Sequence, residues 1–283
     1  MFSKSSQAVI LAAAIILSES AANAAPDFSA SAGTGWISFG PEYIPARGKP
    51  RPVSADPAHP FVPNAVEILS GQPDAKVSDK TTVPVSDVTN PILQPWVRAQ
   101  LTKLNQQVLS GHPFYSKHAS CWPMGVPTFL LYPVAPVYFI QSPGEVTIVW
   151  QGDHMVRHVY LNVPHSTSIR PSFYGDSIGH YEGDTLVVDT IGLTTRTYVD
   201  EFRTPHTDKL RVTERFHIIN GGKTMQVDVH VEDPGAFTTP WDAIQRYRRV
   251  ERGPLEEQTC SENQVNPFNE PYEPIPQAKR QDF

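Results

Sequence analysis

The feature that most limits the fold of this chain is a series of short segments in which apolar and polar residues alternate. Successive side chains of a β-strand point to opposite faces of the sheet, so this alternation predicts strands with one buried and one exposed face. Tight turns separate the segments, and Asn220-Gly221-Gly222 marks the clearest hairpin. The predicted strands are Val137–Gln141, Glu145–Gln151, Met155–Asn162, Asp184–Ile191, Leu210–Ile219, Lys223–Glu232 and Trp241–Glu251.

Consecutive strands without helices between them predict an antiparallel meander. Such a sheet must protect its edge strands from pairing with other chains, and closure into a barrel does so. We therefore expect residues 112–283 to form an antiparallel β-barrel. A β-sandwich is the alternative, because the number of strands does not separate the two folds.

The part of the chain before the barrel is predicted to hold an arm and one helix. Residues 25–90 are rich in proline and show no sustained periodicity, which predicts an extended arm lying across the β domain. Residues 91–111 are predicted to form a helix that covers the barrel, with Asn90 as its N-cap and Pro91 in its first turn. The apolar stripe of this helix consists of Val97, Leu101, Leu104 and Val108.

Residues 1–24 are predicted to be a cleaved signal peptide. Lys4 supplies a positive charge, Ala8–Leu17 is apolar, and Ala22-Asn23-Ala24 is a typical cleavage site. The apolar run is shorter than the roughly 20 residues that a membrane-spanning helix needs. We therefore expect a protein of the periplasm or a secreted protein, without membrane insertion after cleavage. An uncleaved N-terminal anchor is the alternative.

The net charge bears on the class of binding partner, and the two cysteines bear on covalent cross-linking. The formal net charge of −6 disfavours nucleic acid and anionic lipid, because both select basic surfaces. The two cysteines, Cys121 and Cys260, are predicted to form a disulfide bond in an oxidising compartment. A free thiol nucleophile is the alternative. The sequence does not indicate an oligomeric state.

Residues Arg170–Leu193 have the sequence RPSFYGDSIGHYEGDTLVVDTIGL. This segment resembles a large group of secreted bacterial proteins of unknown function that share a pattern close to G-x-S-x-G-x-[WY]-E-G-D-T-L-V-V-D-T. Shorter segments resemble the same group, namely Cys121–Pro127, Glu214-Arg215, Asp233-Pro234 and Pro240-Trp241. The chain departs from the pattern at Asn162-Val163, where the group has Asp-Gly. The resemblance implies an exported β protein and no particular activity. The hairpins are also similar to those of lipocalin-like barrels.

Ser177 lies between Gly175 and Gly179, a spacing similar to the nucleophile elbow of serine hydrolases. That elbow needs a helix after the serine, whereas a strand-forming run follows here, so a glycine-supported turn is expected instead. A metal site made by His158, His165, His180 and a carboxylate is left open, but no spacing requires one. We predict no metal and no cofactor.

Glu214 is the most informative polar residue of the predicted strands. It shares one strand face with Leu210, Val212, Phe216 and Ile218, so an inward apolar face would carry a single carboxylate into the interior. An unpaired buried carboxylate is costly, and proteins retain one mostly for an ion pair or for acid–base chemistry. The two interpretations are a catalytic acid and a structural partner of an arginine such as Arg246 or Arg157.

These observations predict a barrel that binds a small, partly apolar organic molecule and acts on it by cofactor-independent acid–base catalysis, as a lyase, isomerase or hydratase. His165 or His180 would move the proton, Glu214 would orient that histidine, and Tyr174 would donate a hydrogen bond to a developing oxyanion. The predicted substrate-binding residues are His158, Tyr160, Asp176, Glu182 and Arg215. The alternatives are a non-catalytic carrier and a structural protein of the cell envelope.

Overall fold

The computed structural model describes residues 26–29, 34–60, 84–111, 121–132, 135–152 and 155–251. The predicted signal peptide and Cys260 lie outside the described residues, so cleavage and the Cys121–Cys260 disulfide stay predictions. None of the described helices is both long enough and apolar enough to span a bilayer.

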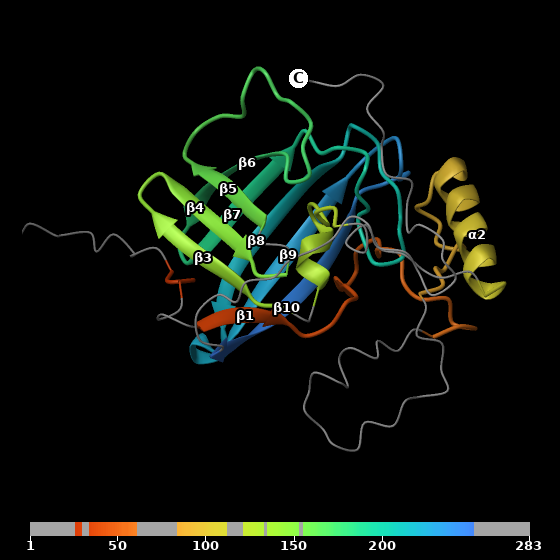
Figure 1. Ribbon diagram of the computed structural model, residues 1–283, viewed down its shortest axis with the longest axis horizontal. Coiled ribbons are helices and arrows are strands. Elements are labelled where there is room, and N and C mark those ends of the chain that lie inside the picture. Colours follow the sequence, from red (N-terminus) through yellow and green to blue (C-terminus); the bar gives the residue numbers. More distant parts are fainter. Residues whose placement is uncertain are drawn as a thin grey trace, which may run out of the picture.

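The described residues form a mainly β protein built around a closed barrel (Figure 1). The strand order is β1-β3-β4-β5-β6-β7-β8-β9-β10-β2, and β1 also pairs with β10, which closes a ring of nine strands and leaves β2 outside it. The prediction of a barrel is therefore confirmed, and the sandwich is excluded. The strands are β1 (Thr34–Ser38), β2 (Ile44–Pro45), β3 (Val137–Ser142), β4 (Glu145–Trp150), β5 (Met155–Leu161), β6 (Asp176–Glu182), β7 (Thr185–Ile191), β8 (Arg211–Ile219), β9 (Thr224–Glu232) and β10 (Trp241–Glu251).

One strand pair corrects the prediction of a purely antiparallel meander. β5 and β6 are parallel, with Tyr160 opposite Ile178, and residues 162–175 cross from the end of one strand to the start of the other. β6 begins where a turn was expected. Gly179 permits this pairing, because a Cβ atom there would lie only 2.9 Å from Cγ1 of Val159 and 3.0 Å from the carbonyl oxygen of Val187.

The N-terminal arm contributes directly to the barrel. β1 pairs with β10 along its whole length, from Thr34 opposite Glu251 to Ser38 opposite Tyr247, and it also meets β3 at Val137. The expectation of an arm lying across the domain was therefore wrong for this segment, because β1 is the strand that closes the ring. Pairing with two strands removes the exposed edges that an open sheet would leave.

The helix α2 (Pro95–Leu109) lies at one end of the barrel (Figure 1). It starts four residues later than predicted, with Gln94 as the N-cap and Pro95 in the first turn, because Leu93 instead forms a bridge with Phe237. Val97, Leu101 and Val108 are buried, as the apolar stripe predicted. Trp96 Nε1 donates to the carbonyl oxygen of Gly235 at 2.7 Å, which ties α2 to the β9–β10 connection.

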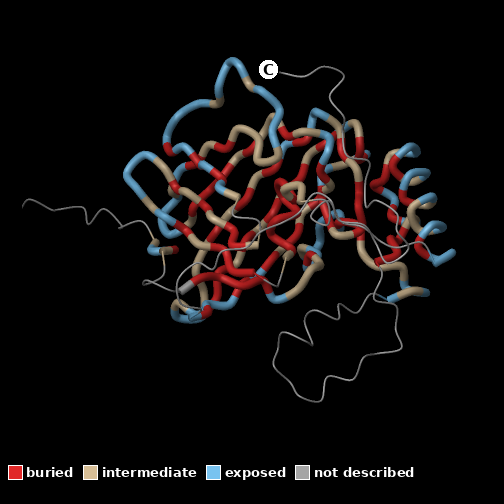
Figure 2. Tube along the Cα trace, viewed as in Figure 1, coloured by how far each residue is buried: buried red, intermediate tan, exposed pale blue. Residues whose placement is uncertain are grey.

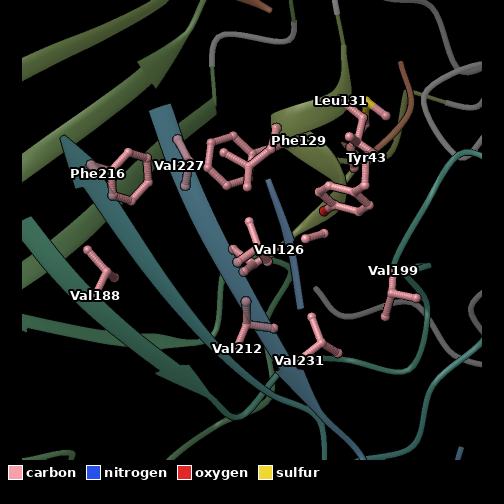
Figure 3. Packing of buried hydrophobic residues seen from close by; sticks show 14 of the residues in the cluster. Tyr43, Val126, Phe129, Leu131, Val188, Val199, Val212, Phe216, Val227 and Val231 are labelled. Carbon is pink, nitrogen blue, oxygen red and sulfur yellow. The ribbon is translucent and has the colours of Figure 1, made fainter. Parts of the chain in front are cut away.

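The barrel interior is filled by side chains and by a short plug (Figure 3). Buried residues recur along the barrel strands (Figure 2). The plug is the 3₁₀ helix η2 (Thr128–Leu131), all four residues of which are buried. The hydroxyl of Tyr247 donates to the carbonyl oxygen of Leu130 at 2.7 Å, and that of Tyr43 donates to the carbonyl oxygen of Pro127 at 3.2 Å. Phe129 packs with Phe216 and Val227 of the barrel wall in one apolar cluster.

Candidate functional site

Glu214 points into the barrel as predicted, and there it meets Arg157 of β5. Both side chains are almost completely buried, at 0% and 1% exposure. The guanidinium binds the carboxylate through two nitrogens, at 3.0 Å from Nη1 to Oε1 and 2.5 Å from Nη2 to Oε2. Such a fork is the strong geometry for a buried ion pair. The structure therefore has Arg157 rather than Arg246 as the partner of Glu214.

The remaining donors of Arg157 are also satisfied. Nε donates to the hydroxyl of Ser177 at 3.1 Å, and Nη2 donates to the hydroxyl of Thr190 at 2.7 Å. The ring of Phe129 in the plug lies 5.2 Å from the guanidinium carbon. Ser177 is thus a buried strand residue that supports an ion pair, without the strand–turn–helix arrangement of a hydrolase nucleophile. This network fixes the interior and leaves Glu214 with no free role towards a guest molecule.

The outer wall of the barrel carries a cleft of about 290 Å³ between β5 and the residues that lead into β6. The outward side chains of β5 contribute Val156, His158 and Tyr160, all exposed. The alternation of β5 therefore places the histidine and the tyrosine outside the barrel. The lining residues are Met155, Val156, His158, Tyr160, Ser172, Phe173, Tyr174, Gly175, Asp176 and Ser177.

His158 forms the clearest acid–base arrangement in this cleft. Its Nδ1 lies 2.5 Å from Oε1 of Glu145 on the neighbouring strand β4, and that carboxylate also accepts from the hydroxyl of Thr147 at 2.8 Å. The hydrogen bond from His158 is the main cause that lowers the pKa of Glu145, followed by the bond from Thr147. A carboxylate on Nδ1 fixes the ring and its tautomer, and in the described residues Nε2 has no hydrogen-bond partner.

His165 joins the crossover segment to the barrel wall through two carboxylates. Its Nδ1 lies 2.8 Å from Oδ2 of Asp176 on β6, and its Nε2 lies 3.0 Å from Oδ2 of Asp189 on β7. Arg211 binds Asp189 through Nε at 2.9 Å and Nη2 at 2.7 Å.

This charge network also sets the ionisation of Asp189. Partial burial raises the pKa of this carboxyl, but the hydrogen bonds from Arg211 and His165 outweigh it, so the pKa is lowered. The hydrogen bonds from Arg211 and His165 therefore favour the ionised form of Asp189. His165 accordingly acts as a tether between the crossover segment and the wall, at the side of the cleft where Asp176 lies.

The predicted site residues fall into three places rather than one. Tyr174, Asp176, His158 and Tyr160 line the outer cleft, and His165 contacts Asp176. His180 is exposed four residues further along β6, roughly 13 Å in a strand, and its Nε2 pairs with Glu182 at 3.0 Å. Glu182 also binds Arg215 at 2.6 Å. With Glu214 in the interior, the four residues predicted to be catalytic do not meet at one site.

A second acidic group, which sequence reasoning missed, lies in the connection between β7 and β8. Asp200 is 3% exposed; its Oδ1 accepts from the backbone amides of Phe202 and Thr204, while its Oδ2 has no hydrogen-bond partner. Oε1 of Glu201 is buried without a partner as well. Burial raises the pKa of Asp200 to about 6, and burial together with the charge of Asp200 raises that of Glu201 to about 8.

These two acids interact electrostatically with Tyr43, which contacts the plug. Burial is the main cause that raises the pKa of Tyr43, and the charges of Glu214, Asp200 and Glu201, among others, raise it further. The acid pair therefore lies towards the end of the barrel that Tyr43 occupies. No period-two or helical pattern covers residues 192–210, so the sequence offered no signal for it beyond the adjacent acids themselves.

Within the described part of the chain, no group of three or more His, Cys, Asp or Glu side chains could hold a metal ion. The fold and the cleft together define a closed, plugged β-barrel with a polar and aromatic cleft on its outer wall. Comparison with protein-family models, with curated proteins and with solved structures found no match. The resemblance to secreted bacterial proteins thus stays a prediction.

Proposed function

We propose that this protein is exported and binds a small, partly apolar organic molecule in the outer cleft beside β5. The observation that supports this most directly is the composition of the cleft, in which Val156, Phe173 and Tyr174 offer apolar and aromatic surface next to His158 and Asp176. Ligand sites combine an apolar lining with a few polar groups that orient the ligand. At about 290 Å³ the cleft suits a ligand of one ring or a short branched chain.

The Glu145–His158 pair gives the cleft a group that can take up or release a proton. Glu145 would stabilise the positive charge that His158 gains as a base, and His158 itself lines the cleft. His158 is therefore the base or acid in our proposal, in place of His165, both nitrogens of which are engaged. Asp176 and Tyr160 would bind polar groups of the ligand. A carrier without catalysis uses the same contacts.

A thermal-melt screen of the whole mature chain tests ligand binding. The compounds are small phenolic, terpenoid and sugar-derived molecules, such as 4-hydroxybenzaldehyde, camphor and methyl glucoside. A ligand at one hundred times its Kd stabilises a protein by about 2.7 kcal/mol, which raises the Tm of a chain of this size by roughly 5–10 °C. If no compound shifts the Tm, or if every hit acts equally on a Val156→Arg variant that fills the cleft, the proposal is overturned.

The variant His158→Gln separates an enzyme from a carrier. In an enzyme it removes turnover of the bound compound by about 10²-fold or more, whereas in a carrier it weakens binding only a few-fold. His180→Gln is the matched control, because His180 is equally exposed and carboxylate-paired but lies outside the cleft. Equal turnover in the parent protein and in His158→Gln would contradict the catalytic role and leave binding as the function.

A further inference from the structure

A second hollow, of about 510 Å³, lies on the outer wall where β2 approaches the turn between β8 and β9. It shares no residue with the cleft beside β5. Its lining residues are Phe39, Ile44, Ile219, Asn220, Thr224 and Arg246.

The floor of this groove is apolar although it faces solvent. Phe39 is 53% exposed and Ile44 is 41% exposed, which places them among the most exposed large hydrophobic side chains that the structure describes. Their backbone is held firmly, because the amide of Phe39 donates to the carbonyl oxygen of Arg246 at 2.9 Å and Ile44 pairs with Ile244 in the sheet. Exposed apolar surface that lines a hollow indicates a binding site more often than scattered apolar residues do.

Arg246 provides the groove with its only charged lining group. Its Nε donates to Oε1 of Gln226 on β9 at 3.0 Å, which fixes the plane of the guanidinium. In the described residues no acceptor binds Nη1 or Nη2. Asp228, a carboxylate on the neighbouring strand β9, binds the side-chain amide of Gln226 at 3.0 Å and lies 3.7 Å from His217. The two terminal nitrogens therefore form an unused fork for an anion.

We propose that this groove binds an organic anion with an apolar body, of the class of a medium-chain carboxylate. The carboxylate binds Nη1 and Nη2 of Arg246, and the chain lies along Phe39 and Ile44. This site is independent of the cleft beside β5 and would remain if the proposed function failed. The charged lining residue also differs in sign, because Asp176 lines the first cleft whereas Arg246 lines this groove.

Calorimetric titration of the whole mature chain with sodium decanoate, below its critical micelle concentration, tests the proposal. Decyltrimethylammonium is the matched probe, with the same chain and the opposite charge. We expect decanoate to bind the parent protein, Arg246→Gln to weaken binding at least tenfold because a charged hydrogen-bonding group is lost, and Phe39→Ala to weaken it several-fold. Arg248→Gln, which removes an exposed arginine two residues along β10, should change binding at most twofold.

Four further outcomes of the titration support or contradict the proposal. Retention of decanoate binding in His158→Gln supports a separate site, and competition with a ligand of the first cleft contradicts it. Equal affinity for decanoate and decyltrimethylammonium would show that only the apolar surface binds, which overturns the role of Arg246. Absence of decanoate binding by the parent protein overturns the proposal as a whole.

Discussion

The interior of this barrel and its outer wall use charged residues in opposite ways. Inside, Arg157 and Glu214 form one fully buried pair in which every guanidinium nitrogen has a partner. Outside, histidines and carboxylates form pairs that stay partly exposed, such as His158 with Glu145 across two strands and His180 with Glu182 along β6. Both members of the buried pair are fully engaged with each other and their neighbours, whereas the wall retains groups that can still bind or exchange a proton.

The difference indicates which residues of this barrel stabilise the fold and which are available to bind a ligand. A buried ion pair contributes a single well-defined packing arrangement, and its loss is costly because one charge is left unpaired. A partly exposed pair contributes little to the free energy of folding, so it is free to serve a ligand. Stability should therefore depend on the interior residues, and binding on the wall.

The largest expected effect on stability is that of Arg157→Met. The change leaves the Glu214 carboxylate buried without a partner, and we expect a loss of about 3–5 kcal/mol in the free energy of unfolding. Urea unfolding measures it. The double variant Arg157→Met/Glu214→Leu removes both charges and should recover most of the loss. If the free energy of unfolding of Arg157→Met lies within about 1 kcal/mol of that of the parent protein, the buried pair contributes no more than an exposed pair does. That result would contradict the difference between interior and wall.

The acid pair at the end of the barrel should give an intermediate effect that depends on pH. The folded pKa of Glu201 is raised to about 8 from its ordinary value of 4.5, so the folded protein holds a proton that the unfolded chain has released. The free energy of unfolding therefore falls as pH rises from about 4.5 to 8, by roughly 3–4 kcal/mol at most. The raised pKa of Asp200 likewise lowers the free energy of unfolding as pH rises, up to about pH 6.

Glu201→Gln isolates this contribution. The variant should match the parent protein near pH 4 and exceed it in stability at pH 8, as measured by urea unfolding across that range. Subtracting the parent profile removes other groups, such as His206, whose pKa burial lowers. Asp184→Asn in the exposed β6–β7 turn serves as the control and should give a flat difference. A flat difference for Glu201→Gln would show that its carboxyl is ionised and solvated.

The smallest effect is expected on the wall. Glu145→Gln removes the partner of His158 and should lower the free energy of unfolding by about 0.5 kcal/mol at pH 7, because the pair is largely exposed. The hydrogen bonds from His158 and Thr147 lower the pKa of Glu145. The contribution of Glu145 to the free energy of unfolding is therefore present at neutral pH and disappears as pH falls below about 4.5. A loss as large as that of Arg157→Met would erase the distinction between wall and interior.

The strands that alternate strictly were predictable from the sequence. β3, β4, β5, β7, β8, β9 and β10 begin and end within about two residues of the predicted bounds, because most of their inward positions are apolar and alternate with outward positions. The alternation also placed Glu214 correctly on the inner face. β6 was not predicted, because Gly175, Gly179 and polar residues interrupt its alternation of apolar and polar residues. β1 was not predicted either, because a strand this short in a proline-rich segment shows no recognisable alternation.

The candidate site was predictable only in part. Strand alternation shows that His158 and Tyr160 share a face, but it does not show which face is outside. The partner of Glu214 is 57 residues away in the sequence and was one of two arginines considered. His165 binds Asp176 of β6 and Asp189 of β7, which the antiparallel β6–β7 pair brings together. No local pattern in the sequence indicated β6.

The most direct test of the whole account is backbone chemical-shift mapping with the compound that gives the largest thermal shift. We expect the perturbed amides to cluster on β5 around Val156, His158 and Tyr160 and on residues 172–177. The chemical shifts of the plug and of the interior face of β8 should stay unchanged. Perturbations centred on Phe129 and Phe216 would instead show that the plug yields to a guest inside the barrel. That result would contradict a sealed interior and a functional wall.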